Sequence, residues 1–69
     1  MTEGVYKIIE LAGSSPDSIE EAVNKAVRQA SDTVRKLSWF TIKEIRGTLA
    51  QDAVAEWQAI IRVGFKVEE

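Results

Sequence analysis

The sequence predicts an α+β domain of β-α-β-β order, in which one long helix packs on a twisted three-stranded antiparallel sheet. Three observations predict this fold. Residues 16–36 carry apolar side chains at helical spacing. Residues 5–12, 38–49 and 54–67 are rich in β-branched and aromatic side chains, as strands are. Residues 50–53 make a short connection, which is typical of an antiparallel hairpin between the last two strands.

The first predicted strand, residues 5–12, carries apolar side chains on both faces. That pattern suits a strand with the core on one side and a neighbouring element or subunit on the other. The turn cluster Gly13–Asp17 follows and also resembles a helix start, because Ser15 can cap the helix and Pro16 fits its first position.

The predicted helix runs from Pro16 to about Lys36, about 21 residues or roughly 30 Å. Arg35 falls with Lys36 in its last turn, where positive charge is favourable. Its apolar positions are spaced by three and four and are Ile19, Ala22, Val23, Ala26, Val27, Ala30, Val34 and Leu37.

The middle strand is the least regular of the three. If Phe40 and Ile42 point into the core, Trp39 points away from it, and an outward-facing Trp is unusual. Strict alternation would then place Glu44 and Arg46 on the core face. Either a bulge lies near residues 43–44, or the strand outruns the helix and both of its faces meet polar surroundings.

The last predicted strand alternates regularly from Val54 to Val67. Trp57 is in phase with the core and is predicted to pack there, whereas Gln58 faces the other way. The core face comprises Ala55, Trp57, Ala59, Ile61, Val63, Phe65 and Val67, and the opposite face comprises Glu56, Gln58, Ile60, Arg62, Gly64 and Lys66.

A single domain spanning residues 1–69 is too small to be stabilised easily by its own core, which rarely supplies more than roughly 3–5 kcal/mol at this size. The sequence has no cysteine for a disulfide and no histidine, so we expect no metal site either. One helix can cover only one face of the sheet. We therefore predict self-assembly through the other face and the strand edges.

Composition disfavours several classes of function. The net charge of −2, with charges spread along the chain, shows no basic patch for nucleic acid, and no apolar run approaches the roughly 20 residues of a membrane span. The N-terminus lacks the features of a signal peptide, so we expect a cytoplasmic protein. Without a histidine, a cysteine or a Gly-rich phosphate loop, and with the acidic pairs Glu20–Glu21 and Glu68–Glu69 interpreted as solvated surface, we expect no enzyme.

Trp39 and Gln58 are the best candidates for binding, because both are predicted on the face away from the helix. An indole can stack on a planar ring, and a carboxamide can donate to and accept from a ring edge. The alternative interpretation is that Trp39 packs in a subunit interface and Gln58 bonds to a neighbouring chain.

Nearly the whole sequence resembles the dodecin family. The resemblance rests on a Trp-Phe strand followed by Ile-Arg-Gly, together with a closing Val-Gly-Phe. The matching segments are Val5–Leu11, Gly13–Ser18, Leu37–Gly47, Trp57–Gln58 and Val63–Glu68.

The resemblance implies a hollow homododecamer with helices outward and sheets inward. Dodecins bind flavins in pairs at two-fold contacts, each flavin stacked on a Trp that matches Trp39 and hydrogen-bonded by a Gln that matches Gln58. Arg46 matches a position that contacts the phosphate-bearing tail of the flavin in bacterial members. Bacterial dodecins also bind coenzyme A through a basic residue that matches Lys66, which is Arg in many relatives; Lys lacks the bidentate fork of Arg.

We therefore predict a flavin storage protein that binds FMN, or alternatively riboflavin or FAD, and protects it. A second hypothesis is a coenzyme A or phosphate-ligand buffer that uses Arg46, Arg62 and Lys66. A purely structural oligomer and a small redox enzyme with bound flavin are the third and fourth.

Overall fold

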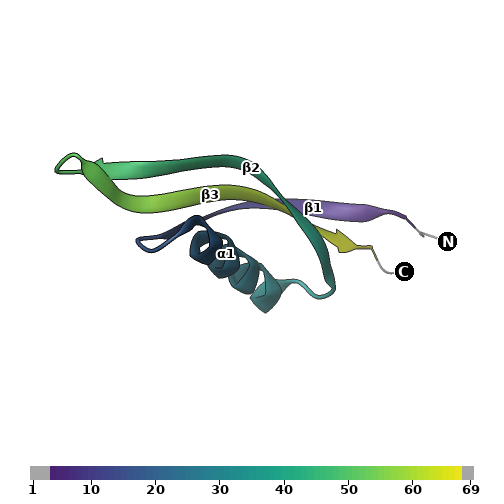
Figure 1. The fold of residues 1–69 in the computed structure, drawn as a ribbon. Helices are drawn as coiled ribbons and strands as arrows, with labels where there is room; N and C mark the ends of the chain where they lie inside the picture. Colours follow the sequence, from purple (N-terminus) through teal and green to yellow (C-terminus); the bar gives the residue numbers. More distant parts are fainter. Residues whose placement is uncertain (1–3, 68–69) are drawn as a thin grey trace.

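The predicted β-α-β-β order is confirmed in a computed structural model, which describes residues 4–67 (Figure 1). Glu68 and Glu69, interpreted above as solvated surface, lie outside the described residues. The elements are β1 (Tyr6–Ser15), α1 (Ile19–Thr33), β2 (Leu37–Ala50) and β3 (Ala53–Lys66). No helix in the described part of the chain is long and apolar enough to cross a membrane.

The three strands form one antiparallel sheet in the order β1-β3-β2, so β3 is central and β2 is an edge strand. The helix α1 packs on β1 and β3 across one face of the sheet (Figure 1). The hairpin that joins β2 to β3 projects well beyond α1, and the molecule is elongated, 54 × 20 × 13 Å. The opposite face of the sheet has no helix, and we call it the helix-free face.

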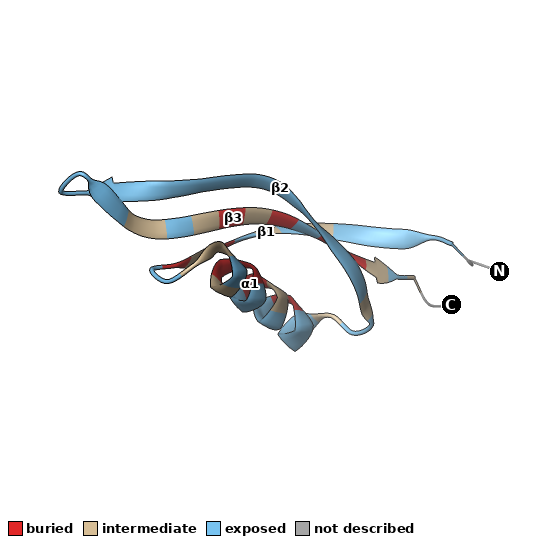
Figure 2. Ribbon diagram, in the orientation of Figure 1, coloured by how far each residue is buried: buried red, intermediate tan, exposed pale blue. Residues whose placement is uncertain are grey.

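The core lies between the centre of β3 and the inner side of α1 (Figure 2). Ala59, Ile61 and Val63 of β3 are buried there, which confirms the central part of the core face predicted for this strand. Small side chains bring the helix close to the sheet: a Cβ added to Gly13 would overlap the backbone of Ala22. The buried residues of this core cluster are Ala22, Val23, Ala26, Ala59, Ile61 and Val63.

The predicted start of the helix was wrong by three residues. Ser18, not Ser15, is the N-cap, and its Oγ accepts a hydrogen bond from the Glu21 N–H at 3.0 Å. Pro16 lies before the helix, because β1 continues to Ser15, where it pairs with Trp57 of β3. Ser15 is buried, and its Oγ instead accepts from the Asp17 N–H at 2.9 Å.

The predicted end of the helix was also wrong. The helix ends at Thr33, and Val34 already has an extended backbone with φ −129° and ψ 135°. Lys36 then has φ +63°, a left-handed conformation that cannot continue a helix. Arg35 and Lys36 therefore lie in the connection to β2, and Leu37 begins that strand.

Three of the predicted core positions in the hairpin are exposed. Phe40 is 50% exposed, Ile42 39% and Trp57 37%, so their predicted burial was wrong for the single chain. The reason is the length of α1: 15 residues span only about 22 Å, and they lie over β1 and β3. Figure 2 shows the consequence, since β2 is exposed along almost its whole length.

Candidate ligand-binding site

Trp39 lies on the helix-free face near the start of β2. It pairs with Gly64 of β3, and its ring lies across that glycine: a Cβ added to Gly64 would overlap the indole. The ring of Tyr6, from β1, contacts it with centroids 6.2 Å apart and planes inclined by 58°. Trp39 is nevertheless 40% exposed. The predicted orientation of Trp39, away from the core, is therefore confirmed.

A bulge at Lys43 changes which side chains share this face. Ile42 pairs with Ile61 and Glu44 pairs with Ile60, so Lys43 is an extra residue in β2. After the bulge the alternation is inverted. The bulge that the sequence left open as an alternative is observed, and it moves Glu44 and Arg46 onto the helix-free face.

Arg46 and Gln58 are direct cross-strand partners and contact each other. The Arg46 Nε donates to the Gln58 Oε1 at 2.9 Å, and Glu44 lies 3.8 Å from the Arg46 guanidinium. This bond holds the amide oxygen of Gln58, so its NH2 group is the part that can donate to a ligand. Sequence reasoning selected both residues but not their contact.

Trp39 and Gln58 share the helix-free face, as predicted, but the hairpin does not bring them together. Trp39 pairs with Gly64, six residues from Gln58 along β3, which is about 20 Å at the rise of a strand. A ring stacked on Trp39 is therefore out of reach of the Gln58 amide of the same chain. The two groups can serve one ligand only if they come from different chains.

Arg62, a candidate phosphate contact, is already paired. Its Nε donates to Glu10 Oε1 at 3.2 Å, while the other carboxylate oxygen of Glu10 lies 3.4 Å from the Lys43 Nζ. The hydrogen bond from Arg62, helped by the charge of Lys43, lowers the pKa of Glu10 against a smaller opposing effect of burial. A phosphate at Arg62 would have to use its Nη groups, beside the opposing negative charge of Glu10.

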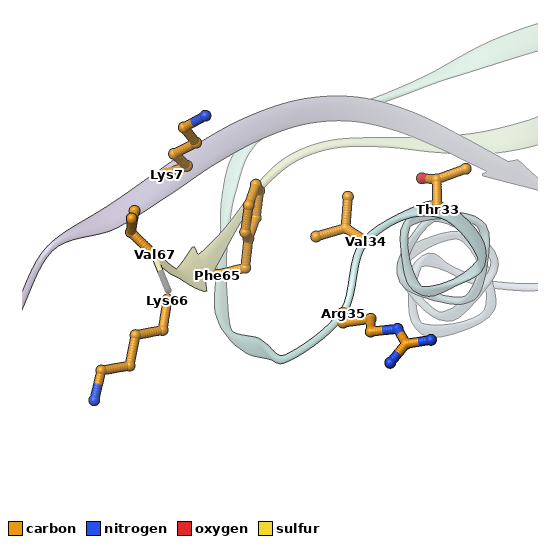
Figure 3. A pocket seen from close by; sticks show the side chains of 7 residues that line it. All are labelled: Lys7, Thr33, Val34, Arg35, Phe65, Lys66 and Val67. Carbon is orange, nitrogen blue, oxygen red and sulfur yellow. The ribbon is translucent and has the colours of Figure 1, made fainter. Parts of the chain in front are cut away.

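Lys66 borders a groove at the end of the sheet far from the β2–β3 turn. The groove lies between the end of β3 and the segment that follows α1. Figure 3 shows Phe65 at its centre, with the cationic ends of Lys7, Arg35 and Lys66 pointing in different directions. The groove offers an apolar ring and positive charge, as a phosphate ligand with an apolar body would need. Its lining residues are Lys7, Thr33, Val34, Arg35, Phe65, Lys66 and Val67.

Two residues of the Trp39 surroundings were missed. Tyr6 belongs to the predicted strand 5–12 and Gly64 was predicted on the face of the last strand opposite the core, but neither residue was connected with Trp39. A glycine inside a strand signals close approach of another group, and that signal could have identified Gly64.

Comparison with known proteins gives consistent matches over nearly the full length. A family model described as Dodecin matches residues 5–68. The dodecin of Thermus thermophilus is 46% identical over 65 residues, which are 94% of each chain. The structure of dodecin from Streptomyces coelicolor is 42% identical, covers 100% of this chain and 99% of its own, and superposes with a TM-score of 0.92. That of dodecin from Streptomyces davaonensis is 34% identical, with coverages of 94% and 96% and a TM-score of 0.88.

Proposed function

The chain belongs to the dodecin family, and from this membership we propose that it binds flavin, with FMN the expected ligand, and stores and protects it without turnover. The observation that carries the proposal is the indole of Trp39. It is held against the sheet by one side, lies on the face without a helix, and keeps 40% of its surface exposed. An isoalloxazine ring system is flat and apolar enough to stack on such a surface.

The proposed site needs more than one chain. Because about 20 Å separates Trp39 from Gln58 within a chain, we infer that they meet across a two-fold axis near β2. A two-fold rotation reverses the strand direction, so it can place the Gln58 end of one hairpin beside the Trp39 end of another. Gln58 would then donate to a ring carbonyl through its NH2 group, and Arg46 would turn to the phosphate of FMN.

Exposed apolar surface supports assembly, for which we propose the homododecamer. Phe40, Ile42 and Ile45 pair with Val63, Ile61 and Ala59, so they lie on the helix side of the sheet. They are nevertheless exposed in the single chain, with Ile45 at 56%. A row of exposed apolar side chains on an edge strand is typical of a surface that a partner covers.

Protection follows from the stacking. A photoexcited isoalloxazine in contact with an electron-rich indole can accept an electron and return it, which shortens the excited state and the time for photochemical damage. The protein needs no acid, base or nucleophile for this role.

The test is reconstitution with FMN followed by native mass spectrometry. We expect a dodecamer that carries flavin, with FMN fluorescence quenched in the complex and recovered on denaturation. A colourless oligomer that leaves FMN fluorescence unchanged would favour a structural role. Steady oxidation of a reduced nicotinamide by the loaded protein would favour the redox enzyme.

The groove at Phe65 and Lys66 favours a second candidate, a coenzyme A or phosphate-ligand buffer. The three cations around it do not converge, so such a ligand would have to draw the flexible side chains of Lys7 and Lys66 together. Calorimetric titration with coenzyme A tests it. Binding that is lost in Lys66→Ala and kept in Arg62→Ala would locate the ligand in the groove; no heat of binding would exclude the site.

A further inference from the structure

We propose that Gly64 and Tyr6 are positioning residues that fix the plane of the Trp39 indole, so that one face of the ring is presented to the ligand before it binds. The inference rests on the proposed flavin binding for its ligand. The arrangement itself involves only Gly64, Tyr6 and Trp39, and it can be measured in the protein without flavin.

The glycine at position 64 has no conformational reason to be there. Gly64 lies inside β3, paired with a residue of each neighbouring strand, and its φ is outside the left-handed range that favours glycine. Glycine weakens such a strand position, because it has no side chain to pack and loses more backbone entropy on folding. The close approach of the Trp39 ring supplies the missing reason, since any Cβ here would occupy the space of the indole.

The geometry indicates that the ring lies with its face, not its edge, toward Gly64. An added Cβ would come closest to Cε2 and Cζ2 of Trp39, with Nε1 next at 2.8 Å. In an approach within the ring plane, Cε2 would be the farthest of these three atoms, because Nε1 and Cζ2 project beyond it; it is instead the nearest. One face of the indole is therefore held on the backbone of β3, and the opposite face is directed away from the sheet.

Tyr6 bounds the same ring from the side. It comes from β1, on the far side of β3, and pairs with Lys66, two residues from Gly64. Its ring inclines at 58° to the indole with 6.2 Å between centroids, a tilted arrangement favourable for aromatic pairs. All three strands thus contribute to holding one side chain: β2 carries the indole, β3 supports it and β1 limits its sideways motion.

A side chain fixed in its bound orientation need not be immobilised when the ligand arrives. The conformational entropy that is not lost on binding corresponds to roughly a two-fold to ten-fold lower dissociation constant for one ordered side chain. We therefore expect Gly64→Ala and Tyr6→Leu each to weaken FMN binding by about that factor, while Tyr6→Phe, which keeps the ring, binds as the parent protein does.

The experiment uses the full-length protein with Trp57→Phe, so that Trp39 is the sole indole. Fluorescence anisotropy and acrylamide quenching of Trp39 are measured without flavin, followed by FMN titration. We expect a more mobile and more accessible indole in Gly64→Ala and Tyr6→Leu but not in Tyr6→Phe. An indole whose anisotropy and quenching are the same in all variants would overturn the proposal. If Gly64→Ala does not fold, the two Tyr6 variants decide alone.

The flavin-free measurement separates the two proposals. If the parent protein does not bind FMN, the proposed function fails, whereas the indole measurements still decide whether Gly64 and Tyr6 fix Trp39. If FMN binds and the indole is equally immobile in every variant, only the positioning role fails.

Discussion

Trp39→Ala removes the proposed stacking surface without touching the core. The side chain lies on the helix-free face and is 40% exposed, and it is absent from the buried cluster between β3 and α1. We therefore expect the folded chain and its assembly to be largely retained. The ligand, by contrast, loses its aromatic contact.

The size of the loss follows from stacking energies. Each aromatic face contributes on the order of 1–3 kcal/mol to a stacked planar ring. At 1.4 kcal/mol per factor of ten, this corresponds to roughly five-fold to 150-fold in the dissociation constant for FMN. Trp39→Phe should lose less, because it keeps a smaller aromatic face.

Titration of FMN, followed by the quenching of its emission, measures the affinity, and size-exclusion chromatography checks the assembly. Trp57→Phe is the control: Trp57 is similarly exposed, at 37%, but lies on the helix side of the sheet, so FMN affinity should stay unchanged. An unchanged affinity in Trp39→Ala would refute the stacking argument. Loss of the oligomer with that substitution would instead support the alternative, in which Trp39 is a subunit contact.

Three further predictions concern stability, measured by denaturant unfolding at fixed protein concentration. Ser18→Ala removes the N-cap bond to Glu21 and should cost about 1 kcal/mol, whereas Ser14→Ala should cost less. Ile61→Ala empties a fully buried position and should cost about 2–5 kcal/mol; a loss below 1 kcal/mol would contradict the assigned core. Arg62 and Lys43 lower the pKa of Glu10 in the folded protein. The ionised Glu10 therefore contributes to the free energy of unfolding above the pKa of an unfolded glutamate, and this contribution is lost as pH falls through the lowered value. Glu10→Gln should therefore flatten the decline in stability below about pH 4, and an unaltered acid limb would contradict this.

The order of the elements could be predicted from the sequence, because hydrophobic periodicity depends only on local geometry. The regular alternation of β3 identified Ala59, Ile61 and Val63 as core and Gln58 as facing away from it, and both assignments hold. The outward orientation of Trp39 followed from the same argument.

The helix ends could not be predicted as well, because several residues compete for each role. Ser15 and Ser18 are both good caps, and the choice between them depends on how far β1 continues to pair with β3. At the other end, apolar Val34 and Leu37 fit the helical spacing, yet the chain turns at Lys36 to enter β2. These outcomes depend on tertiary pairing, which periodicity does not contain.

The sequence predicted the face of the sheet on which Trp39 and Gln58 lie, but not the distance between them. Parity places Trp39 and Gln58 on one side of the sheet, whereas their separation depends on the register between β2 and β3. The bulge shifts that register by one residue. The sequence showed a conflict near residues 43–44, but the position of the extra residue emerges only from the paired strands.

Because Lys43 is an extra residue outside the pairing of β2 with β3, the effect of a deletion in β2 depends on its position. Deleting Lys43 would leave Ile42 opposite Ile61 and Glu44 opposite Ile60, so the strand would alternate regularly and keep its side chains on their present faces. Deleting Ile45 instead, beyond the bulge, would bring Arg46 opposite Ala59 and turn its guanidinium toward the helix side of the sheet. In this protein a single codon lost two positions beyond the bulge would therefore remove a proposed ligand contact without substituting any residue, whereas the loss of the bulge residue itself would spare it.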